Sequence, residues 1–237
     1  SVGTCGLARG ADESVTAAKD YLKEKKLQKQ IEIKITGCHG LCEAEPNVVV
    51  MIDNSKIFYQ KLKPENIAEI IDRTILKQEI LDKFLFPATK KGEKNINIDD
   101  VPFYRKQNRL LLNNNLYIDP TKIKDYIIIG GYSALHKVLN EYKPSEIVKI
   151  IKDSGLRGRG GAGFLTGIKW GLCRNAKSDI KYIICNADEG DPGAYMDRSL
   201  LEGNPHSVLE GMIIGAYAIG AKQGIIYVRN EYPLAIK

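Results

Sequence analysis

The stretch "GLRGRGGAGF" at residues 155–164 restricts the possible folds more than any other part of this 237-residue sequence. Gly158, Gly160 and Gly163 have the G-x-G-x-x-G spacing of a dinucleotide-binding turn, which requires a strand before it and a helix after it. Here the preceding residues, "PSEIVKIIKDSG", have helical periodicity, and the strand pattern "IKYIICN" comes afterwards. Because this order is inverted, the sequence predicts a glycine-rich surface for another kind of contact rather than an ordinary Rossmann phosphate turn.

Length and composition are those of a globular protein with one or two domains. Hydrophobic residues make up 43% and charged residues 27% of the chain, which are ordinary values. The net charge of +6 is spread along the sequence, and this favours a solvated surface over a nucleic-acid footprint. The apolar runs are too short to span a bilayer, and the chain opens without a secretory signal pattern, so we expect a cytoplasmic protein.

The first part of the chain has the pattern of a small α/β unit. A helix over 12–26 is followed by "IEIKIT", whose alternating apolar and polar residues predict a half-buried strand over 31–36. Two further strands, over 47–52 and 56–62, flank a turn at 53–55, and Pro64 then opens an amphipathic helix. This element order predicts a thioredoxin-like sandwich over residues 1–83.

The rest of the chain divides into a polar segment and a second predicted domain. Residues 84–120 are rich in Lys, Asn, Asp and Pro and are interpreted as a linker or an extended arm that packs on its neighbour. Residues 121–237 form the second predicted domain. Its expected elements are helices over 121–129, 131–141, 144–153 and 205–219, a buried strand over 180–186 and a strand over 224–230.

Five cysteines in a chain without a secretory mark indicate ligation rather than disulfides. Cys38 and Cys42 form a CxxxC turn, and Cys5 lies in a glycine-flanked turn before the first helix. Glycine allows backbone amides to approach bound sulfur, so this arrangement favours an iron–sulfur cluster. A zinc site that includes His39 and a set of inert buried thiols are the alternatives. Cys173 and Cys185 have no CxxC partner and are assigned to a helix and a strand.

The two cysteine turns, "SVGTCGLARGA" and "TGCHGLCEAEPNVVV", resemble the thioredoxin-like [2Fe-2S] ferredoxin domain of NADH-oxidising complexes. That family has Cys-x4-Cys followed, after a long gap, by Cys-x3-Cys. The resemblance implies that Cys5, Cys38 and Cys42 are the second, third and fourth cluster ligands. The first ligand would fall immediately before Ser1, so the sequence is expected to be a fragment.

Two later motifs, "SGLRGRGGAGFLTGIKW" and "ICNADEGDPGAYMDRSLLEGNPH", resemble the flavoprotein subunit of respiratory complex I and the matching subunits of NAD-linked hydrogenases and formate dehydrogenases. The resemblance implies that an FMN shell is formed by residues Gly158, Arg159, Gly160, Lys169, Asn186, Asp188 and Glu189. Lys169 and Glu189 would act at the reacting flavin. Cofactor contacts are also implied for Gly163 and, on the dinucleotide side, for Gly161, Phe164 and Asp191. The family commonly has Pro where this chain has Leu165 and Glu where it has Asp191, and the shorter side chain of Asp191 would shorten the contact with the nucleotide.

The chemistry of these residues suits stacked rings. Glycines let the backbone lie flat against a ring and leave amides free for oxygen acceptors. Lys169 and Arg159 can balance negative charge on phosphate or reduced flavin, and Phe164 can stack on a ring. As alternatives, "DEGDPG" could bind a divalent cation, and Trp170 is expected in the core.

The fold class expected is α/β, with a thioredoxin-like ferredoxin domain followed by the start of an atypical Rossmann-like FMN/NADH-binding domain. The expected function is NAD(P)H oxidation, or NAD(P) reduction, through FMN and a [2Fe-2S] cluster, with a [4Fe-4S] cluster in a C-terminal part beyond Lys237. Partners would be the iron–sulfur subunits of a hydrogenase, formate dehydrogenase or NADH dehydrogenase complex. A non-enzymatic [2Fe-2S] carrier with a docking domain is the alternative.

Overall fold

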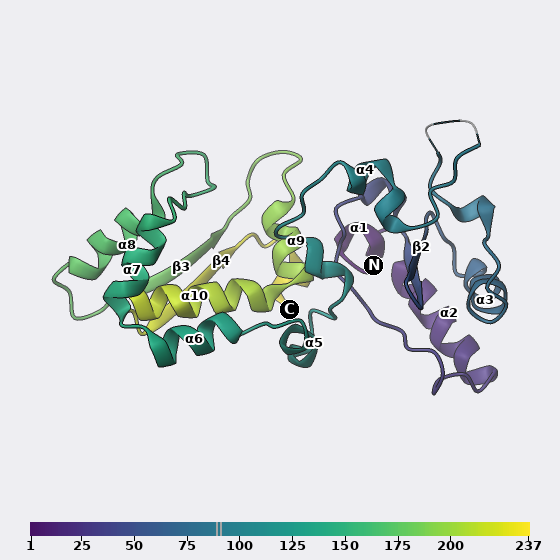
Figure 1. The fold of residues 1–237 in the computed structure, drawn as a ribbon, viewed down its shortest axis with the longest axis horizontal. Helices are drawn as coiled ribbons and strands as arrows, with labels where there is room; N and C mark the ends of the chain where they lie inside the picture. The colour runs from purple at the N-terminus through teal and green to yellow at the C-terminus, as the bar shows by residue number, and fades with distance from the viewer. Residues whose placement is uncertain (89, 91) are drawn as a thin grey trace. The chain divides into compact units, whose positions relative to one another are not determined.

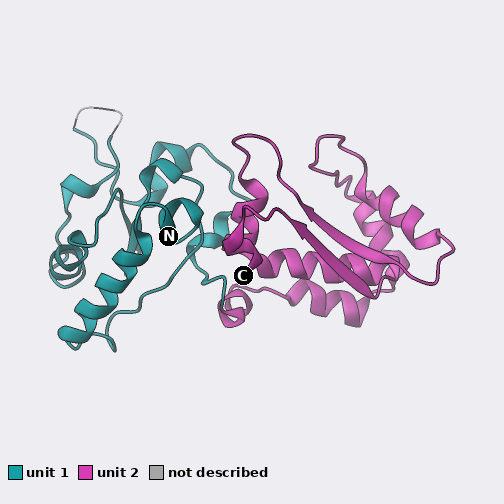
Figure 2. Cartoon of the chain, turned by 180° about the vertical axis from the view of Figure 1, so that it is seen from behind, with its two compact units in different colours: residues 1–121 teal, residues 122–237 magenta. Residues whose placement is uncertain are grey.

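The computed structural model describes residues 1–88, 90 and 92–237. The chain divides into two compact units, Ser1–Thr121 and Lys122–Lys237 (Figure 2). Both units mix helices with strands, which confirms the α/β class. Among the described residues, no helix is long and apolar enough to cross a membrane.

Unit 1 is built from one long helix, one hairpin and many short helical turns (Figure 1). Its elements are α1 (Thr4–Leu7), α2 (Ala11–Glu24), η1 (Cys42–Ala44), β1 (Val48–Ile52), β2 (Ser55–Tyr59), α3 (Asn66–Glu69), the π-helix η2 (Ile70–Ile75), η3 (Asp82–Phe84), η4 (Ile98–Asp100), α4 (Pro102–Arg105) and η5 (Asn113–Leu116). The predicted helix over 12–26 and the hairpin are confirmed within a few residues. The helix expected from Pro64 is present as α3 continued by η2.

The hairpin β1–β2 separates two apolar clusters. Val50, Ile57 and Tyr59 belong to a cluster formed with α2, α3 and η2. Phe58, which has no exposed surface, belongs to the second cluster, formed with Ile98, Val101, Tyr104, Leu116 and others. The alternation of side chains along a strand explains how consecutive residues reach opposite faces. Much of the second cluster comes from residues 84–121, which the structure packs into unit 1.

The prediction of a strand over residues 31–36 is wrong. Residues 31–39 have no regular secondary structure, and β1 pairs only with β2 among the described residues. A cavity of about 510 Å³ is lined by both this segment and β1. The segment is held instead by other neighbours, because Val2 N donates to Thr36 O at 2.8 Å and Lys34 Nζ donates to Tyr117 O at 3.1 Å.

Unit 2 consists of helices packed on a two-stranded sheet. Its elements are α5 (Ile123–Ile128), α6 (Ser133–Glu141), α7 (Pro144–Asp153), α8 (Thr166–Asn175), β3 (Tyr182–Ala187), α9 (Met196–Gly203), α10 (Pro205–Ile219), β4 (Gln223–Val228) and α11 (Pro233–Ile236). The predicted helices and strands of this region are confirmed. A helix, α7, does precede the glycine-rich stretch, and a strand, β3, follows it.

Strands β3 and β4 are parallel, with Tyr182 opposite Gln223 and Ala187 opposite Val228. Helix α10 covers one face, where a Cβ built on Gly215 would lie 3.1 Å from both Ile183 and Trp170. Trp170 is therefore a packing residue, as the sequence suggests. The opposite face is open and carries the exposed side chains of Tyr182, Ile184, Ile225 and Tyr227. The expectation of a buried strand is thus correct for only one face of β3.

Candidate functional sites

The glycine-rich stretch forms a closed loop between α7 and α8. An isolated antiparallel bridge joins Arg157 to Leu165. Within it, Gly158 N donates to Phe164 O at 2.9 Å, and Thr166 N donates to Leu156 O at 2.9 Å. The Arg157 guanidinium also donates to Gly163 O at 2.9 Å. These bonds fix the ends of the loop and leave residues 159–162 exposed at its tip.

The tip of this loop has room for a bound ring or phosphate. A Cβ built on Gly160, Gly161 or Gly163 would meet no atom within 4 Å, and Gly161 and Gly163 have φ values of +101° and +62°. The backbone amides of residues 159–163 have no hydrogen-bond acceptor within the described part of the chain. Free amides on a flat, glycine-rich surface are the donors that phosphate or flavin oxygens need, so these residues fit FMN.

Three predicted side chains surround the loop without contributing to its closure. Arg159 and Phe164 are exposed, and Phe164 retains 53% of its accessible surface. Lys169 is also exposed on α8, in the turn that follows the loop. Its ammonium makes no ion pair within residues 1–88, 90 and 92–237 and is available to a bound anion.

The acidic turn follows the carboxyl end of β3. Asn186 lies in the strand, and its Oδ1 accepts a hydrogen bond from Asp188 N at 3.1 Å. Asp188 and Asp191 are exposed, and Asp191 O accepts from Ala194 N at 3.1 Å. Figure 1 shows this turn and the glycine loop extending toward the same side of unit 2. The carboxyl ends of parallel strands are where α/β sheets bind ligands.

Glu189 is held more tightly than its neighbours. Its carboxylate accepts hydrogen bonds from Asp197 N at 3.0 Å, Arg198 N at 3.2 Å and the Tyr232 hydroxyl at 3.2 Å. The Arg229 guanidinium donates to Glu189 O at 2.7 Å. Glu189 therefore caps the N-terminus of α9 and ties the acidic turn to the segment after β4. Burial, followed by the charge of Glu189, raises the pKa of Asp197.

Sequence reasoning missed Arg229 and Tyr232 as parts of this site. Both lie in the stretch "YVRNEYP" at residues 227–233, whose residue types and spacing by themselves suggest no role for either side chain. Tertiary structure brings these residues to Glu189, because β4 ends at Val228 beside the end of β3.

In unit 1 the predicted cysteines lie in α1, which contains Cys5, and in the segment that contains Cys38 and leads into η1 at Cys42. Cys38 Sγ and Cys42 Sγ are 4.0 Å apart, and Gly40 N donates to Cys38 Sγ at 3.2 Å. Burial, the charge of Cys38 and a hydrogen bond with Cys5 raise the pKa of Cys42 to about 12. Burial likewise raises the pKa of Cys38. The protein thus holds these thiols close together, and an amide directed at sulfur is typical of iron–sulfur sites.

Within the described residues, no three His, Cys, Asp or Glu side chains form a ready metal-binding group. His39 is buried, and its Nε2 lies 3.1 Å from Thr36 Oγ1. Burial lowers the pKa of His39 well below its ordinary value. The contact with Thr36 occupies only Nε2, and His39 Nδ1 has no hydrogen-bond partner among the described residues, so this contact does not decide between a cluster with thiolate ligands alone and a zinc site that includes the histidine. Cys42 nevertheless lies 4.0 Å from Cys38, sulfur to sulfur, and interacts with Cys5, so the donor set of the turn is one that could supply part of a thiolate site.

Comparison with known proteins identifies relatives of this chain. Residues 151–237 match the family model described as the Nuo51 FMN-binding domain. The NADP-reducing hydrogenase subunit HndC of Solidesulfovibrio fructosivorans is 59% identical over 133 residues, which cover 56% of this chain and 27% of that protein. An NADH-quinone oxidoreductase subunit of Rhizobium meliloti is 49% identical over 128 residues, which cover 54% of this chain and 30% of that protein.

A third relative matches more of the chain. The alpha subunit of the NAD-reducing hydrogenase HoxS of Cupriavidus necator is 38% identical over 200 residues, which cover 83% of this chain and 30% of that protein. The similarity therefore reaches beyond the residues that the family model matches. The chain spans less than a third of the length of each of these three relatives.

Proposed function

We propose, from the match of residues 151–237 to the Nuo51 FMN-binding domain family, that this chain is part of an oxidoreductase subunit that exchanges electrons between NAD(P)H and iron–sulfur clusters through FMN. The observation that carries this proposal is the glycine loop with unpaired amides at residues 159–163, which lies within the matched segment of the described chain. The relatives named as hydrogenase and NADH-quinone oxidoreductase subunits support the same function.

Bound FMN would supply the chemistry that amino acids lack, because a flavin accepts two electrons as hydride and releases them one at a time. The chain's own residues would bind and orient it. The amides of the loop would donate to its oxygens, and the exposed Lys169 ammonium would balance its negative charge. Asn186 and Asp188 would contact its polar edge from the end of β3.

The nicotinamide nucleotide would bind against the outer side of the same loop. Gly161 offers open space above its backbone, and Phe164 offers an exposed ring for stacking. Asp191 would accept from ribose hydroxyls. Glu189 would line the FMN site, and its carboxylate would at the same time hold the N-terminus of α9. With both rings bound, these residues would orient the nicotinamide against the flavin and would reduce the access of water to the reacting atoms.

The cysteines would receive the electrons in unit 1. We assign Cys5, Cys38 and Cys42 as thiolate ligands of a [2Fe-2S] cluster, because α1 and the segment that leads into η1 bring them together and Gly40 N is directed at Cys38 Sγ. Electrons would then pass to other iron–sulfur subunits of a hydrogenase, formate dehydrogenase or NADH dehydrogenase complex. The relatives are named as subunits of hydrogenases and of an NADH-quinone oxidoreductase, which supports the first and the last of these.

Flavin content and its response to nucleotide test this proposal. The protein, purified with all of its native sequence, should be yellow, and its flavin absorbance should bleach on adding NADH or NADPH under anaerobic conditions. Iron and acid-labile sulfide should be present, and Cys38→Ser should lower them while Cys173→Ser does not. A protein that holds the cluster but no flavin would instead support the electron carrier without enzymatic activity. Stoichiometric zinc in place of iron would refute the cluster assignment.

A further inference from the structure

The cysteine turn is covered by a segment that is distant in sequence. We call residues 102–116, from α4 to η5, the clamp segment. Arg109 Nη2 donates to His39 O at 2.6 Å, and Asn115 Nδ2 donates to Cys38 O at 3.0 Å. A Cβ built on Gly40 would lie 3.7 Å from Leu112 and 3.8 Å from Phe103. Two carbonyls of the CxxxC turn are therefore held by side chains of the clamp segment, which also packs on the turn.

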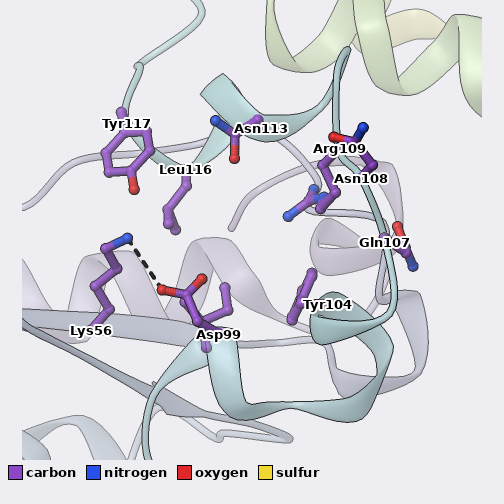
Figure 3. A pocket seen from close by; sticks show the side chains of 10 residues that line it. Lys56, Asp99, Tyr104, Gln107, Asn108, Arg109, Asn113, Leu116 and Tyr117 are labelled. Carbon is purple, nitrogen blue, oxygen red and sulfur yellow. Dashed lines mark hydrogen bonds and ion pairs between the residues drawn. The ribbon is translucent and has the colours of Figure 1, made fainter.

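Arg109 is itself fixed in place. The same nitrogen lies 3.3 Å from Leu112 O, and the guanidinium carbon lies 4.9 Å from the centre of the Tyr104 ring. Figure 3 shows the Arg109 guanidinium above Tyr104 at one side of a cavity of about 300 Å³. On the other side of this cavity, Lys56 pairs with Asp99 at 3.4 Å. Arg109 is thus a half-buried cation next to the cysteine turn, and it forms no ion pair with a carboxylate in the described chain.

Tyr104 connects Arg109 to the second apolar cluster. Its side chain is 5% exposed, and its hydroxyl has no hydrogen-bond partner among the residues that the structure describes. The ring also packs edge-on against Phe58 in the second apolar cluster, with the ring centres 6.0 Å apart. A rigid aromatic side chain between the core and Arg109 restricts how far the guanidinium can move.

We propose that Arg109 is a positioning residue for the cysteine centre: it locks the CxxxC turn through His39 O and places a fixed positive charge at the turn that carries Cys38 and Cys42. The part that concerns a bound cluster rests on the proposed function, whereas the part that concerns the turn does not. A guanidinium remains protonated under all ordinary conditions. Since reduction adds one negative charge to the centre, a nearby cation favours the reduced form.

The first test uses the full chain without metal. Arg109→Gln removes both the charge and the planar donor, Arg109→Lys keeps the charge, and Arg105→Gln removes an exposed charge from the same segment as a matched control. Alkylation of each cysteine would be followed by peptide mass spectrometry, with Cys173 of unit 2 as the internal reference. Rates would be measured across pH and compared at equal thiolate fraction, because loss of a nearby positive charge by itself slows alkylation. On this basis we expect Cys38 and Cys42 to react at least fivefold faster in Arg109→Gln and at least twofold faster in Arg109→Lys than in Arg105→Gln.

The second test uses the reconstituted iron–sulfur protein. The midpoint potential should be lower in Arg109→Gln than in wild type, and Arg109→Lys should retain the wild-type potential because the charge remains. Thiol reactivity equal to that of Arg105→Gln in both Arg109 variants would overturn the positioning role. A potential that does not change in Arg109→Gln would overturn the charge effect. If Arg109→Gln does not fold, Arg109→Lys still decides the first question, and this outcome is independent of whether the centre binds iron or zinc.

Discussion

At the scale of single residues, Glu189 has a structural task beside its proposed chemical one. Its carboxylate accepts from Asp197 N and Arg198 N at the start of α9 and from the Tyr232 hydroxyl. Loss of activity on changing Glu189 would therefore not by itself show contact with flavin. Lys169 has no such task, because its side chain is exposed and makes no ion pair among the described residues.

Lys169→Ala should consequently separate function from folding. We expect the thermal midpoint to remain within the experimental error and the NADH–dye reductase activity of the complete protein to fall at least tenfold. A tenfold loss corresponds to about 1.4 kcal/mol of transition-state stabilisation, a reasonable contribution for a charge beside reduced flavin. Lys177→Ala, an exposed change in the loop after α8, is the control. Normal turnover with bound FMN in Lys169→Ala would rule out its proposed role.

Glu189→Gln should affect stability as well as activity. The amide nitrogen of Gln cannot accept a hydrogen bond, so α9 should lose part of its N-terminal cap, at a cost of about 1 kcal/mol of unfolding free energy. Denaturant unfolding monitored by circular dichroism would measure this loss. A variant with unchanged stability would show that the cap at Asp197 N and Arg198 N contributes little.

The same change gives a prediction about pH. Burial and the charge of Glu189 raise the pKa of Asp197 in the folded protein. The folded state therefore binds a proton at Asp197 more tightly than the unfolded state does. The free energy of unfolding falls as the pH rises from the pKa of Asp197 in the unfolded chain to its higher pKa in the folded protein. Glu189→Gln removes the charge of residue 189, so the pKa of Asp197 should decrease. The fall in the free energy of unfolding with rising pH should then become smaller. NMR titration of the Asp197 carboxyl carbon would measure the decrease, and a pKa that stays the same or rises would contradict it.

At the scale of elements, glycines of two kinds surround the proposed flavin site. Gly167, at the start of α8, touches α7 so closely that a Cβ would lie 2.3 Å from the Lys152 backbone. Gly160, at the tip of the loop, would place a Cβ in open space. The first glycine is required by helix packing, whereas the second is required only if a ligand lies against it.

Two alanine substitutions test this difference. Gly167→Ala should lower the free energy of unfolding by about 1–3 kcal/mol, because the helices must separate to accept the methyl group. Gly160→Ala should leave stability unchanged but weaken FMN binding at least tenfold in a flavin titration followed by fluorescence. Gly211→Ala in α10, where a Cβ also meets open space, is the control for both. Unchanged flavin affinity in Gly160→Ala would indicate that the loop tip does not touch the ring.

At the scale of the whole molecule, the structure divides the chain at residue 121. The sequence suggests a first domain that ends at residue 83. The difference concerns the second apolar cluster, in which Phe58 of β2 packs against Val101 and Tyr104. Phe58 N also donates to Ile96 O at 2.9 Å, beside β2.

Fragments that end at residue 121 and at residue 83 should differ in how cooperatively they unfold. A fragment of residues 1–121 should unfold cooperatively on heating, because it retains both apolar clusters. A fragment of residues 1–83 should show little cooperative unfolding, since Phe58 and one edge of β2 would be exposed to water. Thermal circular dichroism of the two fragments would make the comparison. Equal cooperativity would show that residues 84–121 contribute little to the stability of unit 1.

The sequence by itself determined the features that depend on local order. Periodicity predicted α7, α10, β3 and β4, and the inverted order of helix and strand around Gly158 argued against an ordinary Rossmann turn. Residue types and spacing also identified the cysteines and the glycine loop as candidate sites. These features follow from short-range preferences of the backbone and from motifs contained within a few residues.

Tertiary structure alone decided the features that depend on distant neighbours. The segment 31–36 has the alternation of a strand, yet it forms none, because within the described chain the backbone hydrogen bonds found for it join Thr36 O to Val2 N and Ile31 N to Leu27 O and none joins it to β1. Arg109 meets His39 across 70 residues, and Arg229 meets Glu189 across 40. No local pattern indicates such pairs, because a side chain finds its partner through the path of the whole chain, and that path is set by the packing of the apolar clusters.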